Sequence, residues 1–308
     1  MRSQDDPILQ VQEQKSEGAK VLYHITGYKS SSQFEWLFSA IYNDSDLFII
    51  HVDKKSPKII HQEYRSIAGT NNNIIFLPSL SITWGGCGLI DTELLAIKYA
   101  LENDLSWTHI INLSAQDYPL LSPKTIRDNL ARSWPSNFVL CKNIRQAHWR
   151  IRKRPKFHYI EWNGRRVFTP IPKLKPPGII IDWVGPWWHI LTREFCSWLI
   201  TSEIAHTYLS FLRSAGMPDE MLVQNLIMGS PFKDKAVSCC KHEIIWRHAD
   251  EPRASSARPN ILTIQDLPMI EVSDAYFARK FDHEVDRQIL EALASRNGFA
   301  VPSTSVLR

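Results

Sequence analysis

Hydrophobic positions in the first half of the chain follow two alternating patterns. Short, almost continuous apolar runs predict strands buried on both faces, at residues 20–26, 46–52, 73–77 and 108–114. Between them, apolar residues three and four positions apart predict helices, over 30–43, 57–68 and 88–102. Ser122 and Pro123 then have the residue types of a helix start. This alternation predicts an α/β fold with a mostly parallel central sheet and flanking helices.

The second half continues with fewer predicted elements. Strands are expected at 187–192 and 243–247, and helices at 193–200, from Met217 onward and at 281–295. We expect a polar tail over 1–19, one domain over 20–296 and a C-terminal tail over 297–308. Within the domain we distinguish a first half (20–141), a basic excursion (142–177) and a second half (178–296).

Positive charge is concentrated in the excursion. The whole chain carries only +4, which does not by itself indicate a nucleic-acid binder. Residues 142–175 contain eleven basic residues and one acid, so this segment carries +10 and the remainder −6. Asn163-Gly164 predicts a hairpin inside it. If the segment is extended, Arg150, Arg152 and Arg154 share a face that suits an acidic sugar or lipid diphosphate acceptor; a solvated loop is the alternative.

Several features bear on compartment and on metals. No run of 18 apolar residues is present, and residues 1–20 lack the apolar stretch and cleavage site of a signal peptide. Five cysteines, two of them adjacent, are an odd and low number that fits a reducing environment. We therefore expect a cytoplasmic protein, with peripheral contact with the inner face of the cell membrane left open. Cys239, Cys240, His242 and His248 lack the usual CxxC spacing, so we expect core residues there and no metal.

A ligand site is expected where the predicted parallel strands end. Thr26, Asp53 and residues 114–117 occupy these ends. The chain has neither GxGxxG nor GxxxxGK[ST], and the glycine cluster at 84–88 lacks the lysine and spacing of a phosphate-binding loop. The sequence therefore predicts a ligand site at the edge of the sheet that lacks the known glycine-rich phosphate-binding loops.

Six segments carry a family resemblance. They are FIIHVDKKS (48–56), ITWGGCGLI (82–90), IINLSAQDYPL (110–120), WWHILTREF (187–195), PDEMLVQNLI (218–227) and FARKFD (277–282). In this order they resemble the core-2/I-branching N-acetylglucosaminyltransferases and the peptide O-xylosyltransferases, over residues 21–293. The resemblance implies a GT-A-like nucleotide-sugar-binding fold, a UDP-sugar donor, inversion at the anomeric carbon and no metal requirement.

Sugar transfer from a nucleotide diphosphate requires the departing diphosphate to be neutralised. The only DxD pair, Asp44-Ser45-Asp46, precedes a strand, so we interpret it as a turn. Asp117 stands alone after the fourth strand, and a single carboxylate holds a hard cation poorly. The resemblance instead places Arg279 and Lys280 on the diphosphate, with Arg258 in support; ordinary surface cations are the alternative.

The resemblance assigns the catalytic base to Glu220. A place in the first turn of a helix favours the ionised form that a base needs, although acids are common at helix starts for the same reason. The residues expected on the acceptor side are Arg150, Arg154, Trp187, Trp188 and Asp219. Xylosyltransferases carry an aspartate where this chain has Trp187, which argues against a xylosyltransferase-type acceptor site.

The donor is expected to contact the strand ends. Asp53 would accept hydrogen bonds from uridine, and Thr26 and Gly27 would line the uracil pocket; a cap on the next helix is the alternative for Asp53. The segment 84–86 is closer to the xylosyltransferase version. The predicted nucleotide-sugar contacts are Thr26, Asp53, Lys55, Trp84, Asp117, Arg258, Arg279 and Lys280.

Together these features predict an inverting, metal-independent glycosyltransferase. It would move a sugar from a UDP-sugar to a hydroxyl of a glycan or lipid-linked glycan, in bacterial surface polysaccharide synthesis. N-acetylglucosamine is the preferred sugar, and xylose or another hexose is the alternative. A non-catalytic nucleotide-sugar or carbohydrate-binding protein is a second possibility, against which Glu220 argues. A nucleic-acid binder is a third, against which the low overall charge argues.

Overall fold

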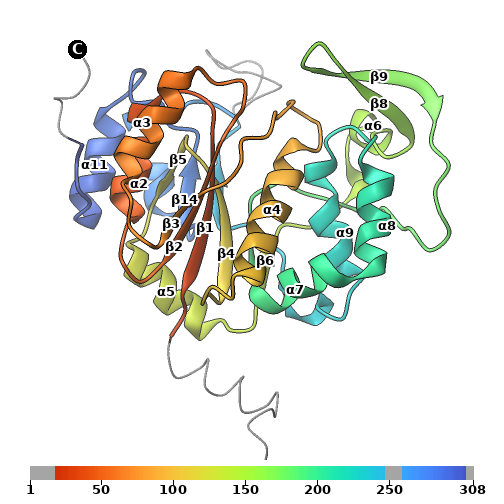
Figure 1. Ribbon diagram of the computed structural model, residues 1–308, viewed down its shortest axis with the longest axis horizontal. Helices are drawn as coiled ribbons and strands as arrows, with labels where there is room; N and C mark the ends of the chain where they lie inside the picture. The colour runs from red at the N-terminus through yellow and green to blue at the C-terminus, as the bar shows by residue number, and fades with distance from the viewer. Residues whose placement is uncertain (1–17, 247–258, 303–308) are drawn as a thin grey trace, which may run out of the picture.

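A seven-stranded sheet forms the centre of the protein in the computed structural model, which describes residues 18–246 and 259–302 (Figure 1). Its strands, in spatial order, are β12 (Ala236–Val237), β6 (Asn137–Val139), β11 (His189–Thr192), β4 (His109–Ser114), β1 (Val21–Gly27), β2 (Leu47–Val52) and β3 (Ile74–Phe76). β11 is antiparallel to β4 and β6, and the other neighbours are parallel. The predicted α/β fold with a mostly parallel sheet is confirmed.

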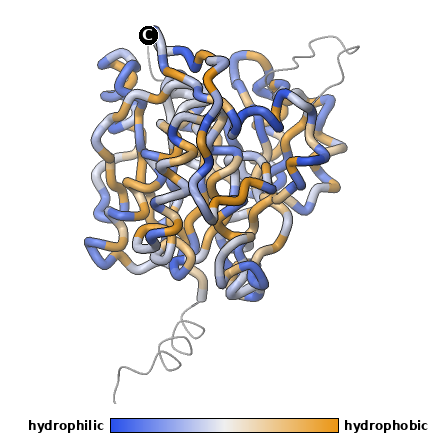
Figure 2. The backbone as a smooth tube through the Cα atoms, turned by 90° about the vertical axis from the view of Figure 1, so that its right-hand side faces the viewer, coloured by the Kyte–Doolittle hydropathy of each residue, from blue (hydrophilic) through white to orange (hydrophobic). Residues whose placement is uncertain are grey.

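Helices cover both faces of the sheet (Figure 1). One layer contains α2 (Ser31–Ile41), α3 (Lys58–Ala68) and α5 (Pro123–Arg132). The other contains α4 (Gly88–Glu102), α7 (Arg193–Thr201), α8 (Glu203–Leu212) and α9 (Leu222–Met228). Along β1, Val21 and Tyr23 pack against the first layer and Leu22 against the second, because successive strand side chains point to opposite faces. Burial on both faces explains why the sequences of the central strands are almost continuously hydrophobic. Figure 2 shows hydrophobic stretches of the backbone running through the interior of the protein.

A smaller sheet brings the C-terminal segment to the end of β4. It consists of β5 (Asp117–Pro119), β14 (Phe277–Arg279) and β13 (His242–Ile244). β14 is antiparallel to β5, which places Arg279 opposite Asp117. Two helices, α10 (Leu267–Glu271) and α11 (Gln288–Asn297), contribute to the core beside it. The terminal helix therefore begins later than the expected 281, and the late strand expected at 243–247 covers His242–Ile244.

The basic excursion forms a hairpin at the end of the molecule where β1 ends (Figure 1). β8 (Phe157–Trp162) and β9 (Arg165–Pro172) are antiparallel. Asn163 and Gly164 join them with φ of 47° and 69°, the left-handed conformations that a tight two-residue turn requires. The hairpin prediction is confirmed. The short helix α6 (Trp149–Arg152) precedes it, and β7 (Lys142–Asn143) pairs with β10 (Trp183–Val184) at its flanks.

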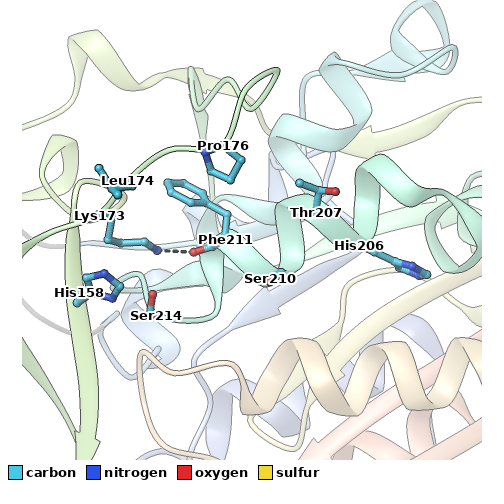
Figure 3. A pocket seen from close by; sticks show the side chains of 9 residues that line it. All are labelled: His158, Lys173, Leu174, Pro176, His206, Thr207, Ser210, Phe211 and Ser214. Carbon is cyan, nitrogen blue, oxygen red and sulfur yellow. Dashed lines mark hydrogen bonds between the residues drawn. The ribbon is translucent and has the colours of Figure 1, made fainter.

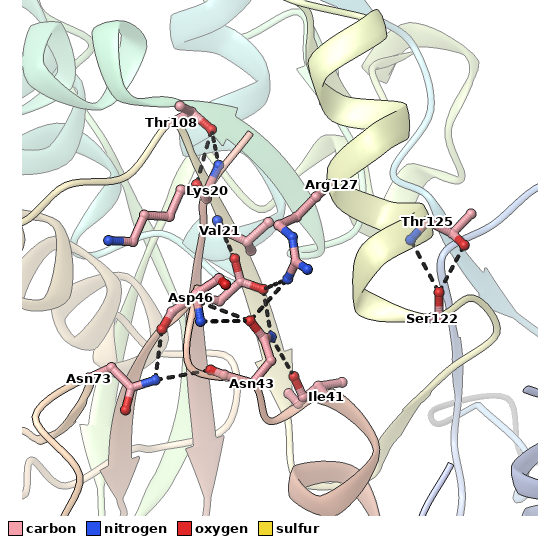
Figure 4. Close-up of polar contacts among 11 residues, drawn as sticks. Lys20, Val21, Ile41, Asn43, Asp46, Asn73, Thr108, Ser122, Thr125 and Arg127 are labelled. Atoms are coloured by element: carbon pink, nitrogen blue, oxygen red, sulfur yellow. Dashed lines mark hydrogen bonds and ion pairs between the residues drawn. The ribbon is translucent and has the colours of Figure 1, made fainter. Parts of the chain in front are cut away.

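The DxD pair lies in a turn before β2, at the opposite end of the strand from Asp53. Asp46 is fully buried, accepts the backbone N–H of Val21 at 2.9 Å and pairs with Arg127 at 2.7 Å (Figure 4). Asn43 donates to the same carboxylate at 2.7 Å. These contacts join the start of β1, the start of β2 and α5. Asp46 is thus a structural acid, as its place before the strand predicts.

Candidate active site

Asp53 follows β2 and is held against the end of β1. Its backbone N–H donates to the carbonyl of Gly27 at 2.8 Å, and its side chain is buried. Its carboxylate accepts the backbone N–H groups of Lys55 at 2.9 Å and Ile82 at 3.4 Å. Thr26, at the end of β1, is also buried. The predicted nucleotide residues Thr26, Asp53 and Lys55 therefore lie together at the expected edge of the sheet, where Asp53 also orders its own loop.

The loop after β3 links the end of β2 to the predicted base. Lys55 Nζ donates to the carbonyl of Ile82 at 2.6 Å, and three residues later the carbonyl of Gly85 accepts the N–H of Met217 at 3.0 Å. Gly85 has φ of 76°, and a Cβ there would lie 2.8 Å from Met217 Sδ, so glycine is required for this approach. Trp84 stands between these anchors with 67% of its surface exposed. The loop thus presents the exposed indole ring of Trp84 between the end of β2 and the segment that carries the predicted base.

Asp117 is a buried hub at the end of β4. Its carboxylate accepts the backbone N–H of Ser114 at 2.7 Å, the hydroxyl of Ser114 at 2.9 Å and the indole N–H of Trp188 at 2.9 Å. Arg279 Nε lies 3.2 Å from it. Both oxygens are therefore occupied by protein groups. The geometry assigns Asp117 to holding β4, β14 and Trp188 together, which differs from the predicted direct contact with the nucleotide.

Arg279 is buried in the same cluster. Its guanidinium carbon lies 3.6 Å from the centre of the Trp188 ring, and only 8% of the residue is exposed. Arg279 thus holds Asp117 through Nε and stacks on Trp188, and its contact with the diphosphate stays a prediction. Lys280 follows directly and is half-buried. Arg258, the third predicted cation, lies outside the described residues.

A short segment joins this cluster to the predicted base. The N–H of Gly185 donates to the carbonyl of Glu220 at 3.0 Å, and Trp188 is three residues further along the chain. Three residue steps span at most about 11 Å. Glu220 and the cluster around Trp188 therefore lie in neighbouring parts of the structure. The fold thus brings residues that were predicted from separate motifs to the same end of the sheet.

Glu220 ends the short 3₁₀ turn Pro218–Glu220 that precedes α9. The sequence predicted a place in the first turn of an α-helix, and this prediction is wrong, because Glu220 lies in the turn before the helix. Arg154 Nη1 lies 2.5 Å from its carboxylate, and the two side chains are 23% and 28% exposed. Burial raises the pKa of Glu220 above its ordinary value, and Arg154 opposes that rise. Arg154, expected on the acceptor, is instead the counter-ion of the predicted base.

Asp219, next to Glu220 in the chain, is buried. Burial first, and the neighbouring Glu220 carboxylate second, raise the pKa of Asp219 to about 7. Its Oδ1 makes no hydrogen bond with any residue that the structure describes. Burial favours the neutral form of a carboxyl group, whereas a hydrogen-bonded cation favours the charged form. The two adjacent acids therefore differ: burial favours protonation of Asp219, whereas the ion pair with Arg154 favours the carboxylate of Glu220.

A buried polar network that no sequence pattern predicts supports the segment 185–188. Glu93, on α4, accepts the indole N–H of Trp187 at 3.1 Å and lies 2.5 Å from His189 Nε2. Burial alone would raise the pKa of Glu93, but His189, His24 and Trp187 outweigh burial and lower it. In a helix with a mostly apolar face, a single glutamate is expected on the solvent side, so the sequence predicts that Glu93 points outward. Only the tertiary fold shows that Glu93 faces the sheet.

The predicted acceptor residues separate into two groups. Trp187, which is 3% exposed, and Asp219 are both buried, so neither presents its side chain on the surface, and their contact with the acceptor stays a prediction. Arg150 and Arg152 are exposed, but they lie in the helix α6, so the expected extended row with Arg154 is wrong. Trp188 remains half-buried next to Arg279.

A groove of about 460 Å³ lies elsewhere, between the strand leaving the hairpin and α8 (Figure 3). Its lining residues are His158, Lys173, Leu174, Pro176, His206, Thr207, Ser210, Phe211 and Ser214. Lys173 Nζ donates to the carbonyl of Phe211 on its wall. Burial lowers the pKa of Lys173 to about 8. None of the predicted site residues lines this groove, so we do not assign the chemistry to it.

The structure combines an α/β fold, as expected for GT-A-like architecture, with polar residues grouped at the strand ends. The family model "Branch: Core-2/I-Branching enzyme" matches residues 21–271, which is most of the chain. The protein belongs to this family of glycosyltransferases, and the resemblance carried by the six segments is confirmed.

Known relatives include two kinds of sugar transferase. Over 295 residues the chain is 23% identical to a zebrafish (Danio rerio) beta-1,3-galactosyl-O-glycosyl-glycoprotein beta-1,6-N-acetylglucosaminyltransferase 4, covering 90% of this chain and 69% of that protein. It is 26% identical to xylosyltransferase 2 of Pan troglodytes, covering 85% and 31%, and 26% identical to human (Homo sapiens) xylosyltransferase 1, covering 86% and 29%. The chain thus spans less than a third of the length of these xylosyltransferases.

Proposed function

We propose that this glycosyltransferase moves a sugar from a UDP-sugar to a hydroxyl group of a glycan acceptor, with inversion at the anomeric carbon. N-acetylglucosamine is the sugar we favour, and xylose or another hexose is the alternative. The proposed setting is the synthesis of a bacterial surface polysaccharide. The observation that carries this proposal is the pair of differentiated acids, in which Arg154 holds the Glu220 carboxylate ionised beside a buried Asp219.

In the proposed reaction, the acceptor oxygen bonds to the anomeric carbon as the bond from that carbon to the UDP oxygen breaks. Glu220 takes the proton of the attacking hydroxyl, and UDP leaves with the bonding electrons. A base with a pKa between that of an ordinary carboxylate and neutrality suits this step. The raised pKa of Glu220 fits that requirement, because burial increases its basicity while Arg154 keeps enough of it charged.

The leaving diphosphate gains negative charge, which a fixed cation stabilises. We assign this role to Lys280, with Arg258 in support. Arg279 would hold Asp117 and Trp188 in place and so fix the segment that presents Lys280. Asp53, Thr26, Lys55 and Trp84 would contact the nucleotide. In the part of the chain that the structure describes, no three His, Cys, Asp or Glu side chains are grouped as metal ligands; metal independence stays part of the proposal.

Slow hydrolysis of the donor tests the proposal without an identified acceptor. The purified protein is incubated with UDP-N-acetylglucosamine, UDP-xylose, UDP-glucose and UDP-galactose in turn, and released UDP is measured. One donor should be hydrolysed well above the others, and Glu220→Gln should abolish that excess. Release from none of them would favour the non-catalytic binding protein, which would retain Asp53 and Lys280. Release unaffected by Glu220→Gln would instead place the base at another residue.

A further inference from the structure

The β8–β9 hairpin has an inner face that packs on the body of the protein. The ring of Tyr159 lies so close to Gly216 that a Cβ there would be 2.8 Å away. Arg166 donates to the carbonyls of Arg213 at 2.6 Å and Ala215 at 2.7 Å. This face therefore rests on the loop that leads into Pro218–Glu220.

The opposite face is apolar and exposed. Strand side chains alternate, so Ile160 and Trp162 on β8 point away from the face that carries Tyr159. The register pairs Ile160 with Val167 and Trp162 with Arg165. Ile160, Val167 and Trp162 are 48%, 40% and 66% exposed, although strand residues of this kind are usually buried. Ile171, further along β9, is 59% exposed. We call these four residues, with Arg165, the outer face of the hairpin.

The charge around this face selects its partner. The segment 142–175 carries +10, whereas the rest of the chain carries −6. Lys156 and Lys175 flank the hairpin at its open end and are exposed. Two copies of so basic a surface would repel each other, which argues against self-association through the hairpin. An anionic partner that also accepts a tryptophan and aliphatic side chains is required.

We propose that the outer face of the hairpin docks the protein onto an anionic lipid bilayer. The interfacial region of a bilayer accommodates indole rings and short aliphatic side chains, and anionic headgroups attract lysine and arginine beside them. No helix among residues 18–246 and 259–302 is long and apolar enough to cross a membrane, so the contact would be peripheral.

Docking in this way would bring the candidate active site close to the lipid surface. The inner face of the hairpin rests on the residues that lead into Glu220, and Arg154, which pairs with Glu220, lies three residues before β8. A lipid-linked acceptor would then reach the site with its headgroup near the bilayer. The docking itself depends on neither the donor nor the chemistry, so its test is separate from the test of the proposed function.

Flotation with vesicles measures the proposed contact on the full chain. Vesicles of phosphatidylcholine alone are compared with vesicles that also contain phosphatidylglycerol. We expect binding only to the anionic vesicles, weakened by added salt. The double variant Ile160→Ser/Trp162→Ser should weaken binding about tenfold or more through lost apolar contact. Arg165→Glu should weaken it about 30-fold, because it changes the local charge by two.

Matched controls separate docking from general effects. Ile59→Ser removes an aliphatic side chain of similar exposure, 54%, from α3. Lys233→Glu reverses an exposed charge in the short turn before β12. Both should bind vesicles like the wild type, and thermal melts should show that all variants are folded. Any of four results would overturn the proposal. The protein could bind uncharged vesicles equally well, or bind no vesicles at all. The outer-face variants could bind vesicles like the wild type, or the protein could bind single-stranded RNA more tightly than vesicles, with that binding abolished in the same variants.

Discussion

Removing the counter-ion of Glu220 should change the pH dependence of the reaction in a direction that the structure fixes. Arg154 and Glu220 approach to 2.5 Å, with side chains 23% and 28% exposed. With about 4 Å between charge centres and an effective dielectric constant of about 20, the attraction is about 4 kcal/mol. Partial exposure reduces this to about 1.5–3 kcal/mol. Because Arg154→Leu deletes the attraction, the pKa of Glu220 should rise by about one to two pH units.

The assay is kcat/KM for UDP release as a function of pH, with the donor that the hydrolysis panel identifies. The acidic limb should move upward by about one to two pH units in Arg154→Leu, because a base with a higher pKa needs a higher pH to ionise. The rate at alkaline pH should recover to within about tenfold of the wild type. Arg154→Lys keeps the charge and should restore most of the limb.

Arg152→Leu is the matched control for this experiment. Arg152 is an exposed arginine on α6, two residues before Arg154. Its removal should leave the acidic limb where it is. The reasoning would be refuted if Arg154→Leu lowered the rate equally at every pH, since Arg154 would then contact the substrate instead of tuning the base.

Three further predictions test the neighbouring residues. Lys280→Ala should weaken UDP binding, measured by calorimetry, at least 30-fold, which corresponds to about 2 kcal/mol or more for a charge-assisted contact. The control Lys98→Ala, on the outer side of α4, should leave UDP affinity unchanged. Wild-type affinity in Lys280→Ala would remove Lys280 from the diphosphate site. Excess EDTA should leave the rate unchanged, whereas a loss that manganese restores would return attention to Asp117. Because the pKa of Asp219 is raised in the folded protein, the folded state binds an extra proton between about pH 4 and about pH 7. The free energy of unfolding of the wild type should therefore fall as the pH rises through that range. Asp219→Asn should remove up to about 4 kcal/mol of that fall in denaturant titrations at several pH values, and parallel stability curves for the two proteins would contradict the assigned pKa.

The hydrophobic pattern predicts the central sheet well, because its strands are buried on both faces. The helix expected at 88–102 is observed as Gly88–Glu102, and Asn163-Gly164 forms the expected turn. The small sheet is different. Asp117–Pro119 and Phe277–Arg279 are three residues each and lie far apart in the chain, so no local period reveals that they pair.

The candidate site shows the same division. The order of the motifs predicts the positions of Asp53 and Glu220, since each lies within a recognisable segment. The roles of Asp117 and Arg279 depend on their mutual contact across β5 and β14, which the sequence alone does not reveal. Arg154 was expected on the acceptor because its neighbours are basic, but the fold turns it onto Glu220. Contacts that link distant segments are where sequence reasoning is weakest.

The role of Glu220 as the base is the central claim, and a single substitution tests it most directly. Glu220→Gln keeps the shape of the side chain and can still accept a hydrogen bond from Arg154, but it cannot take a proton from the acceptor. The account predicts that kcat falls about 10²–10⁴-fold while UDP affinity and the melting temperature stay close to wild type. Asp219→Asn, the adjacent control, should lower kcat far less. Near-normal turnover in Glu220→Gln would contradict the account and show that the base lies elsewhere.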